Sequence, residues 1–461
     1  MIDLREQLGP AGGVKQINRK RVLLAVMIKA DTQAGLSRRT SLSGGTVSAI
    51  VRDMAADGTL LIEKSDNGGR GALVRLCPTS SVAVGVHIGF NHTRVVARRL
   101  DQGFADRHPG EYSNIGANSG LDRLLPEIRQ QVDAAVRRAG GGQQPDIISL
   151  GVAVPRMIDP RTGRFTSPVL PPWNRRDDLA KQLRRTLGLT TVVLDNDANL
   201  GALAEQTFAT DDGMETVVYV KVSTGVGAGL IIGNSLVRGH RGMAGEIGHS
   251  VMEPRGALCR CGGRGCLETV IGADSIVRQV REALSGSSLD VPDSLRSVID
   301  RAHAEDAVCV RVLEDAGRRL GEALAVVCNM LNPNLIVLGG RLEAASDLVL
   351  GPCKESLVRY SLRGTADAVL RKSSLGQLTE AHGALVLGLR SYDRDDDVGG
   401  RRRVGARIPR VLLGGPAEYQ PERLREEVRR TGRALARGHQ PLLARSRSSS
   451  CGARRVPRRT R

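Results

Sequence analysis

Four side chains that could bind a metal ion lie within eighteen residues near the middle of this chain. One imidazole and three thiols follow the spacing His-x9-Cys-x-Cys-x4-Cys, and they belong to His249, Cys259, Cys261 and Cys266. A closed set of four nitrogen and sulfur donors is typical of a tetrahedral structural zinc site. The glycines between the thiols would let the short loop fold back on one ion. The pattern therefore predicts structural zinc, and the alternative is a group of buried or redox-paired thiols.

Two carboxylates bracket these metal ligands. Glu246 lies three residues before the histidine, and Glu268 lies two residues after the last cysteine. Because the nitrogen and sulfur ligands already complete a tetrahedron, the carboxylates are free for another partner. Carboxylates are good hydrogen-bond acceptors for the hydroxyl groups of a polyol, and a loop pinned by a metal would present them rigidly.

The same segment resembles the signature of the ROK family (repressors, open reading frames and sugar kinases), including regulators of the N-acetylglucosamine and xylose repressor type. The family pattern reads Gly-Glu-x-Gly-His and then Cys-x-Cys-Gly-x-x-Gly-Cys-x-Glu, and every fixed position is present here. The resemblance implies that His249 binds zinc and touches a sugar, and that Glu246 and Glu268 hold sugar hydroxyls. It covers about residues 18–389 and implies an α/β fold, a two-lobed, actin-like (ribonuclease H-like) ROK domain with a structural zinc loop.

A second polar group follows the strand predicted at 191–194. The residues Asp195-Asn196-Asp197-Ala198-Asn199 open a predicted helix, and strand ends that meet helix starts line crevices in α/β folds. The resemblance implies that Asn196 and Asp197 contact the sugar, and that Asp197 is the catalytic base in the kinases of the family. A carboxylate within reach of a hydroxyl can take its proton, but the same geometry serves binding alone. A plain helix cap is the alternative.

The first phosphate loop departs from the kinase pattern Asp-x-Gly-Gly-Thr. The chain has His87 in place of the aspartate that handles magnesium, then Gly89, Phe90 and Asn91. Phosphoryl transfer requires a positioned metal and close approach of the backbone, so each change should impair it. A second glycine-rich stretch at 223–229 resembles the other phosphate loop of the family, although its glycines could serve packing alone. We therefore expect a body that binds a sugar and has lost the use of ATP and magnesium.

The first seventy-odd residues predict a DNA-binding module. Apolar periodicity indicates helices over 18–28 and 33–39 and a third from Ser43 to about Asp57, followed by a hairpin of 60–63 with 73–76. This order is that of a winged helix-turn-helix, and 32–43 resembles the helix-turn-helix pattern of the family. The side chains expected to meet phosphates or base edges are Arg38, Arg39, Ser43, Thr46, Ser48 and Arg52, with Arg70 in the wing. The alternatives are a three-helix protein-interaction domain or a solvated basic face.

The net charge of +18 is located mainly at one end of the chain. Residues 401–461 hold 18 arginines and only four acidic residues, so the preceding body is close to balanced. Low apolar periodicity predicts that this segment is disordered. It could be a basic arm that adds DNA affinity, but we favour a dispensable extension. The chain has no apolar run of eighteen residues and no leader pattern, and its other cysteines are scattered, which together favour the cytoplasm over a membrane.

These features predict three parts: a winged helix-turn-helix DNA-binding domain at 1–78, a two-lobed ROK sugar-binding domain at 79–392 and a basic tail at 393–461. We expect a sugar-responsive transcriptional regulator, most simply a repressor of carbohydrate genes. It would bind a double-stranded DNA operator as a homodimer or homotetramer, because palindromic half-sites require two-fold symmetry. The alternative is an ATP-dependent, glucokinase-like sugar kinase with an accessory DNA-binding domain. A regulator that senses a phosphotransferase-system protein stays open as a third reading.

Overall fold

The computed structural model describes residues 13–63, 71–102, 110–141, 145–166, 178–209, 214–286 and 291–391. The chain divides into two units, 1–404 and 405–461, and all described residues belong to the first. Two features expected from the sequence lie outside the described residues: Arg70 of the wing and the basic tail at 393–461.

The first lobe is built on a five-stranded sheet in the order β6-β5-β4-β7-β8. The strands are β4 (Val82–Ile88), β5 (Thr93–Arg99), β6 (Glu111–Ser113), β7 (Ile147–Val154) and β8 (Val192–Asn196). β5 is antiparallel to both of its neighbours, β4 and β6, and β7 and β8 run parallel to β4. One face of the sheet packs on α5 (Leu121–Ala139) and α6 (Leu179–Leu187). β4 and β7 are almost wholly apolar because helices cover both faces.

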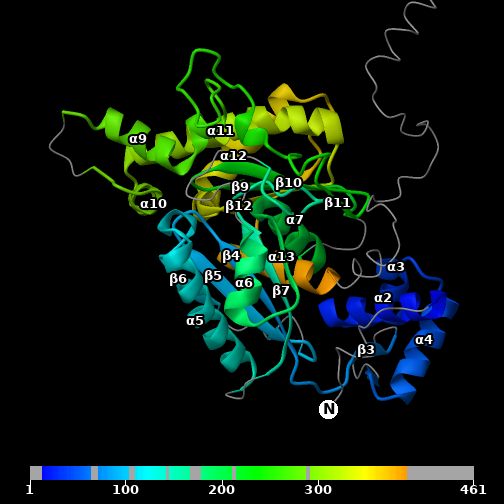
Figure 1. The fold of residues 1–461 in the computed structure, drawn as a ribbon. Coiled ribbons are helices and arrows are strands. Elements are labelled where there is room, and N and C mark those ends of the chain that lie inside the picture. The colour runs from blue at the N-terminus through cyan, green and yellow to red at the C-terminus, as the bar shows by residue number, and fades with distance from the viewer. Residues whose placement is uncertain are drawn as a thin grey trace, which may run out of the picture. The chain divides into compact units, whose positions relative to one another are not determined.

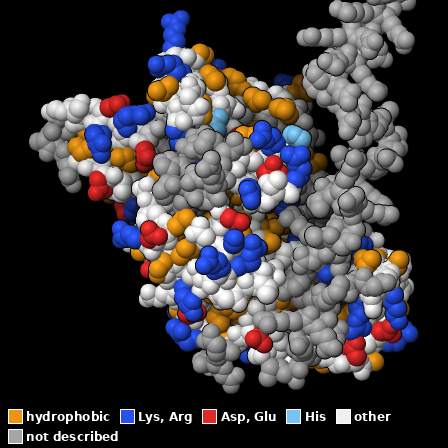
Figure 2. Space-filling view, viewed as in Figure 1, with side chains coloured by type: hydrophobic (Ala, Val, Ile, Leu, Met, Phe, Trp, Pro, Cys, Tyr) orange, Lys and Arg blue, Asp and Glu red, His pale blue; other side chains and the backbone are white. Residues whose placement is uncertain are grey.

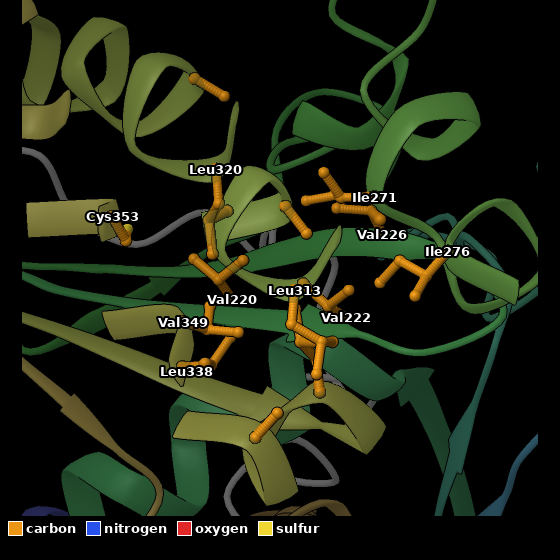
Figure 3. Close-up of a cluster of buried hydrophobic side chains, with 14 of the residues drawn as sticks. Val220, Val222, Val226, Ile271, Ile276, Leu313, Leu320, Leu338, Val349 and Cys353 are labelled. Carbon is orange, nitrogen blue, oxygen red and sulfur yellow. The ribbon is translucent and has the colours of Figure 1, made fainter. Parts of the chain in front are cut away.

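The second lobe has its own five-stranded sheet, in the order β11-β10-β9-β12-β13. The strands are β9 (Val217–Val222), β10 (Val226–Ile232), β11 (Ser235–Val237), β12 (Leu335–Gly340) and β13 (Val369–Lys372). The helices of this lobe are α8 (Glu268–Ile271), α9 (Ala273–Ala283), α10 (Leu295–His303), α11 (Ala307–Leu331) and α12 (Ser346–Tyr360). Figure 3 shows the resulting core, in which Val220 and Leu338 of the sheet face Leu313, Leu320 and Val349 of α11 and α12.

Two helices, α7 (Asp197–Phe208) and α13 (Thr379–Arg390), lie between the two sheets (Figure 1). They approach each other and the strands so closely that side chains do not fit at the contacts. A Cβ atom on Gly383 of α13 would lie 1.8 Å from the carbonyl oxygen of Leu200 in α7. A Cβ on Gly151 of β7 would lie 1.8 Å from the carbonyl oxygen of Ala384 in α13. Glycine at these positions therefore fixes the spacing of the two layers.

The N-terminal part contains three helices and a small antiparallel sheet of order β1-β3-β2. Its elements are α2 (Val14–Ile28), β1 (Asp31–Thr32), α3 (Gln33–Thr40), α4 (Gly44–Ala56), β2 (Leu60–Glu63) and β3 (Leu73–Leu76). Thr32 and Ser43 cap α3 and α4, since each hydroxyl accepts a hydrogen bond from a backbone N–H three residues on, at 3.1 Å. The three helices and the hairpin that the sequence predicts are present, and β1 was not foreseen.

The N-terminal part packs on the first lobe through α2. The core of α2 and α4 is continuous with that of α13, and the guanidinium of the buried Arg98 in β5 donates to the carbonyl of Met27 at 2.5 Å. On the face seen in Figure 2, basic and acidic side chains are mixed, as the balanced charge of the body predicts.

Two elements differ in extent from those expected. The first helix, expected over 18–28, begins at Val14, and the strand expected at 191–194 runs from Val192 to Asn196. The helix that follows begins at Asp197, because the Asn196 side chain caps it.

The close contact at Gly151 can be tested by substitution. We expect Gly151→Ala to lower the free energy of unfolding by about 1–3 kcal/mol or more, because the added methyl group meets backbone that cannot give way. The matched control is Gly351→Ala in α12, where a Cβ meets nothing within 4 Å. That change should stabilise the protein by about 0.5–1 kcal/mol through helix propensity. Urea unfolding followed by circular dichroism measures both, and equal stability of the two variants would contradict the packing described here.

Candidate functional site

A pocket of roughly 940 Å³, including its open mouth, lies between the lobes. Its lining comes from the first lobe, the start of α7, the glycine-rich turn between β9 and β10, and the segment that follows β11. The structure brings together in this lining all five residues that the sequence analysis assigns to ligand binding: Asn196, Asp197, Glu246, His249 and Glu268.

Asn196 and Asp197 occupy the corner between β8 and α7. The side-chain oxygen Oδ1 of Asn196 accepts hydrogen bonds from the N–H groups of Ala198 (2.9 Å) and Asn199 (3.2 Å), so Asn196 is a helix cap as well as a pocket residue. Its side-chain nitrogen Nδ2 donates to the backbone carbonyl of Arg156 at 3.3 Å, which ties the end of β8 to the segment that follows β7. Asp197 opens the helix with its carboxylate towards the cavity, where the positive end of the helix dipole favours an anion.

Asp197 is paired with a lysine that the sequence analysis did not single out. Lys221 of β9 donates to Asp197 Oδ2 at 2.5 Å, and its ammonium lies 3.1 Å from His87 Nε2. Burial would raise the pKa of Asp197, but Lys221 and His87 outweigh it and hold that pKa at about 2. Burial and the neighbouring ammonium lower the pKa of His87, which is therefore neutral. An aspartate with such a pKa is a good hydrogen-bond acceptor and a weak base.

The two glutamates differ in their surroundings. Burial, with smaller contributions from Asp197 and Glu268, raises the pKa of Glu246 to about 7. Glu268 is already engaged, because it accepts hydrogen bonds from the Val226 N–H at 3.1 Å and from Arg260 Nε at 2.7 Å. Arg260 was not foreseen. It lies between two of the predicted zinc ligands, so the metal-binding loop would deliver it to the pocket together with Glu268.

The four predicted metal ligands converge. One donor atom from each of His249, Cys259, Cys261 and Cys266 lies within 4.8 Å of all the others. His249 Nδ1 is 3.6 Å from Cys259 Sγ, and the sulfurs of Cys261 and Cys266 are 3.7 Å apart. A zinc ion with bonds of about 2.3 Å to sulfur places tetrahedral sulfurs about 3.8 Å apart, so the donor set fits zinc. All three cysteines are free thiols in the structure.

The loop that carries these ligands depends on one tight backbone contact. Gly265 has φ of +65°, and a Cβ there would lie 1.5 Å from the carbonyl oxygen of Glu253. His249 presents its other nitrogen, Nε2, to Glu246 at 3.8 Å, so the imidazole separates the sulfur cluster from the pocket.

Comparison with known proteins agrees with this arrangement. The profile of the ROK family matches residues 84–391. The chain belongs to the ROK family. The xylose repressor of Bacillus subtilis is 27% identical over 383 residues, which are 80% of this chain and 94% of that protein. A glucokinase of Halalkalibacterium halodurans is 35% identical over 53% of this chain and 77% of its own length.

A solved structure is similar over the whole of its length. A ROK family transcriptional regulator, described as a homolog of the E. coli MLC protein, superposes with a TM-score of 0.65. It is 23% identical and covers 84% of this chain and 100% of its own. This likeness shows the fold, and it confirms the two-lobed, actin-like α/β architecture expected from the sequence.

The first phosphate loop of this ROK protein is filled by one of its own side chains. The ring of His92 lies over Gly89, since a Cβ on that glycine would be 2.2 Å from His92 Cε1. His92 is buried, and burial lowers its pKa to about 2, so it is a neutral ring. Phe90 and Asn91 line the pocket beside it.

The N-terminal residues expected to contact DNA lie on α3 and α4. Arg38 and Arg52 are exposed, Ser48 is half-buried, and the hydroxyls of Ser43 and Thr46 lie 2.8 Å apart at the start of α4. Arg39 has an internal role as well, because its guanidinium donates to the carbonyls of Ala25 (2.7 Å) and Lys29 (2.8 Å). It therefore closes the end of α2.

Among the helices that the structure describes, none combines the length and the apolar character that crossing a bilayer requires.

The metal-ligand assignment predicts a loss of zinc on substitution. We expect Cys261→Ser to reduce the zinc content from about one ion per chain, because a hydroxyl is a much poorer ligand than a thiolate. Cys77→Ser, at a half-exposed cysteine outside the cluster, should keep the ion. Elemental analysis after gel filtration in zinc-containing buffer measures both. Wild-type protein without zinc, or a Cys261→Ser protein that retains it, would overturn the assignment.

Proposed function

We propose that this ROK protein is a sugar-responsive, DNA-binding transcriptional regulator that represses genes of carbohydrate metabolism. The observation that carries the proposal is the extent of its similarity to the xylose repressor, which spans 94% of that protein and 80% of this chain. The similarity to the xylose repressor covers 383 residues, whereas the ROK profile matches only residues 84–391 of this chain. The similarity therefore includes sequence outside the ROK body.

The N-terminal elements suit a winged helix-turn-helix. α3 and α4 are joined by a short turn, and the β2–β3 hairpin follows as the wing. In this module α4 would enter the major groove, with Ser43, Thr46, Ser48 and Arg52 near its exposed start and first turns. Arg38 and Arg39 would contact the DNA backbone, and Arg70 would reach the minor groove from the wing. Two-fold operators would be met by a homodimer or homotetramer.

The pocket suits an uncharged sugar. Asp197, Glu246 and Glu268 supply acceptors for hydroxyl groups, and Asn196 and His249 supply donors. The zinc ion would bind through His249 and the three cysteines, and its role would be structural, since the four ligands leave no open position. The ion would hold the loop that positions Glu268 and His249.

Helix α13 offers a physical route from the pocket to the DNA-binding module. Its second residue, Glu380, lies 3.8 Å from the Lys221 ammonium under the pocket. Its later residues, including Leu385 and Leu389, belong to the apolar core that also contains α2. A sugar that favours one arrangement of the lobes would therefore shift α2 through a rigid helix. Coupling of this kind is typically about 1–3 kcal/mol.

The DNA-binding proposal predicts a selective effect at Arg52. We expect Arg52→Ala to weaken binding to the operator by about 1–3 kcal/mol if it reads a base, or to lower the salt slope by about one if it contacts a phosphate. Arg123→Ala, an exposed arginine on α5, removes the same charge from the body and should leave affinity unchanged. The duplex is selected from a random pool with the full-length protein, and affinity is measured by fluorescence anisotropy at several salt concentrations. Equal affinities of the two variants would contradict the assignment of α4.

The second candidate is an ATP-dependent sugar kinase, favoured by the 35% identity with a glucokinase and by the position of Asp197 in the pocket. We expect a coupled ADP-release assay over a panel of hexoses to give no turnover above background. The Asp197 carboxylate is a weak base, and the His92 ring occupies the space over the first phosphate loop. Turnover that Asp197→Asn abolishes would establish the kinase instead.

A further inference from the structure

Lys221 places a buried positive charge between the two lobes. It lies on β9 of the second lobe, in a strand whose other residues are valines and Tyr219, and only 7% of its surface is exposed. Its ammonium reaches Asp197 at the start of α7, His87 of β4 and Glu380 of α13. Four elements, from β4 near residue 87 to α13 near residue 380, therefore meet at one amine.

The two carboxylates around this amine have a counter-ion only if the lysine is ionised. Asp197 and Glu380 each bring a carboxylate, and Glu380 also accepts a hydrogen bond from the buried Tyr219 hydroxyl at 3.1 Å. His87 is neutral, and its Nδ1 lies 3.7 Å from Glu380 Oε2. Two buried carboxylates without a cation would carry a large desolvation cost, so the ammonium is the counter-ion that makes this floor of the pocket possible.

The Lys221 ammonium lies against His87. His87 stands at the position where the kinase pattern Asp-x-Gly-Gly-Thr has the aspartate that handles magnesium. Beside it, the His92 ring covers Gly89 of the first phosphate loop. The space and charge that a metal and a phosphate would require are thus supplied by two side chains of this protein.

We infer that Lys221 is a built-in counter-cation that takes the place of a metal at the floor of the pocket. It bridges the two lobes and positions the Asp197 carboxylate to accept a hydrogen bond from a hydroxyl group of an uncharged sugar. The identity of the ligand rests on the proposed function, whereas the bridge itself does not. Lys221 is a positioning residue, because it acts on the ligand through Asp197. Sugar recognition at this floor consequently needs neither nucleotide nor magnesium.

A double-mutant cycle in the full-length protein tests the bridge. Lys221→Met removes the charge and keeps the length of the side chain, Asp197→Asn removes the facing charge, and the third variant combines both. We expect Lys221→Met to raise the unfolding equilibrium constant by about 100-fold or more, because it leaves carboxylates buried without a cation. The double variant should be more stable than Lys221→Met alone. Lys181→Met, at an exposed lysine on α6, is the matched control and should unfold as the wild type does.

The pH dependence separates a charge role from simple packing. Without Lys221, burial and the neighbouring Glu380 and Glu246 would raise the pKa of Asp197 above its unfolded value, with only the neutral His87 opposing them. The folded Lys221→Met protein would then hold a proton that the unfolded chain releases, so its stability should fall between about pH 5 and pH 8 relative to wild type. The double variant should lack this slope, and Lys221→Arg should restore the wild-type profile.

Two results would overturn the inference: a double variant no more stable than Lys221→Met, or a Lys221→Met profile parallel to that of the wild type. Operator binding and its response to D-glucose, D-xylose and N-acetylglucosamine are measured on the same preparations. If those responses fail while the cycle shows coupling, the proposed function falls and the bridge stands.

Discussion

The close packing of α7 and α13 between the two sheets is the constraint on which the site depends. Backbone meets backbone at Gly383 and Gly151, so the spacing of the layers is set to a fraction of an ångström. Both helices begin under the pocket, and each brings a carboxylate in its first turn, Asp197 from α7 and Glu380 from α13. Two helix N-termini there create a partly positive floor, and the Lys221 ammonium is a cation that faces both carboxylates. The packing of α7 and α13 in the core therefore also fixes the positions of the charged groups under the pocket.

The opposite wall of the pocket is made differently. It has little regular structure, and the segment from Gly245 to Glu268 is held by tight backbone turns and by convergence of four metal-ligand side chains. This wall delivers His249, Glu268 and Arg260 to the ligand space. The floor and this wall are thus held by different interactions, and α13 extends from the floor to the core of α2.

Features encoded by local spacing were predictable, and features made by distant segments were not. The four predicted metal ligands lie within one loop, and the cap at Asn196 lies within four residues, so residue types and spacing indicate both groups in the sequence. Lys221 was not predicted, because its partner His87 lies 134 residues away in the sequence. The neighbouring residues of β9 do not indicate which group the lysine would pair with. A lysine inside such a run is nevertheless a usable signal, since an unpaired buried ammonium is costly.

The same distinction holds for the phosphate loop. The loss of the aspartate and of the second glycine could be seen in the sequence, but the filling of the loop by the His92 ring depends on how the chain turns back over Gly89. Arg260 was not predicted for a related reason. It lies between two predicted metal ligands, and only the folded loop shows that its side chain points to Glu268 in the pocket.

The central claim is that one chain binds DNA and that a sugar in the pocket changes that binding. The most direct measurement is the affinity of the full-length protein for its selected duplex, by fluorescence anisotropy, with and without each of D-glucose, D-xylose and N-acetylglucosamine, and without nucleotide. The account predicts that at least one carbohydrate changes the dissociation constant by about 5-fold to 150-fold, and that Asp197→Asn removes the change. A protein that selects no duplex from the pool, or whose affinity no carbohydrate alters, would contradict it.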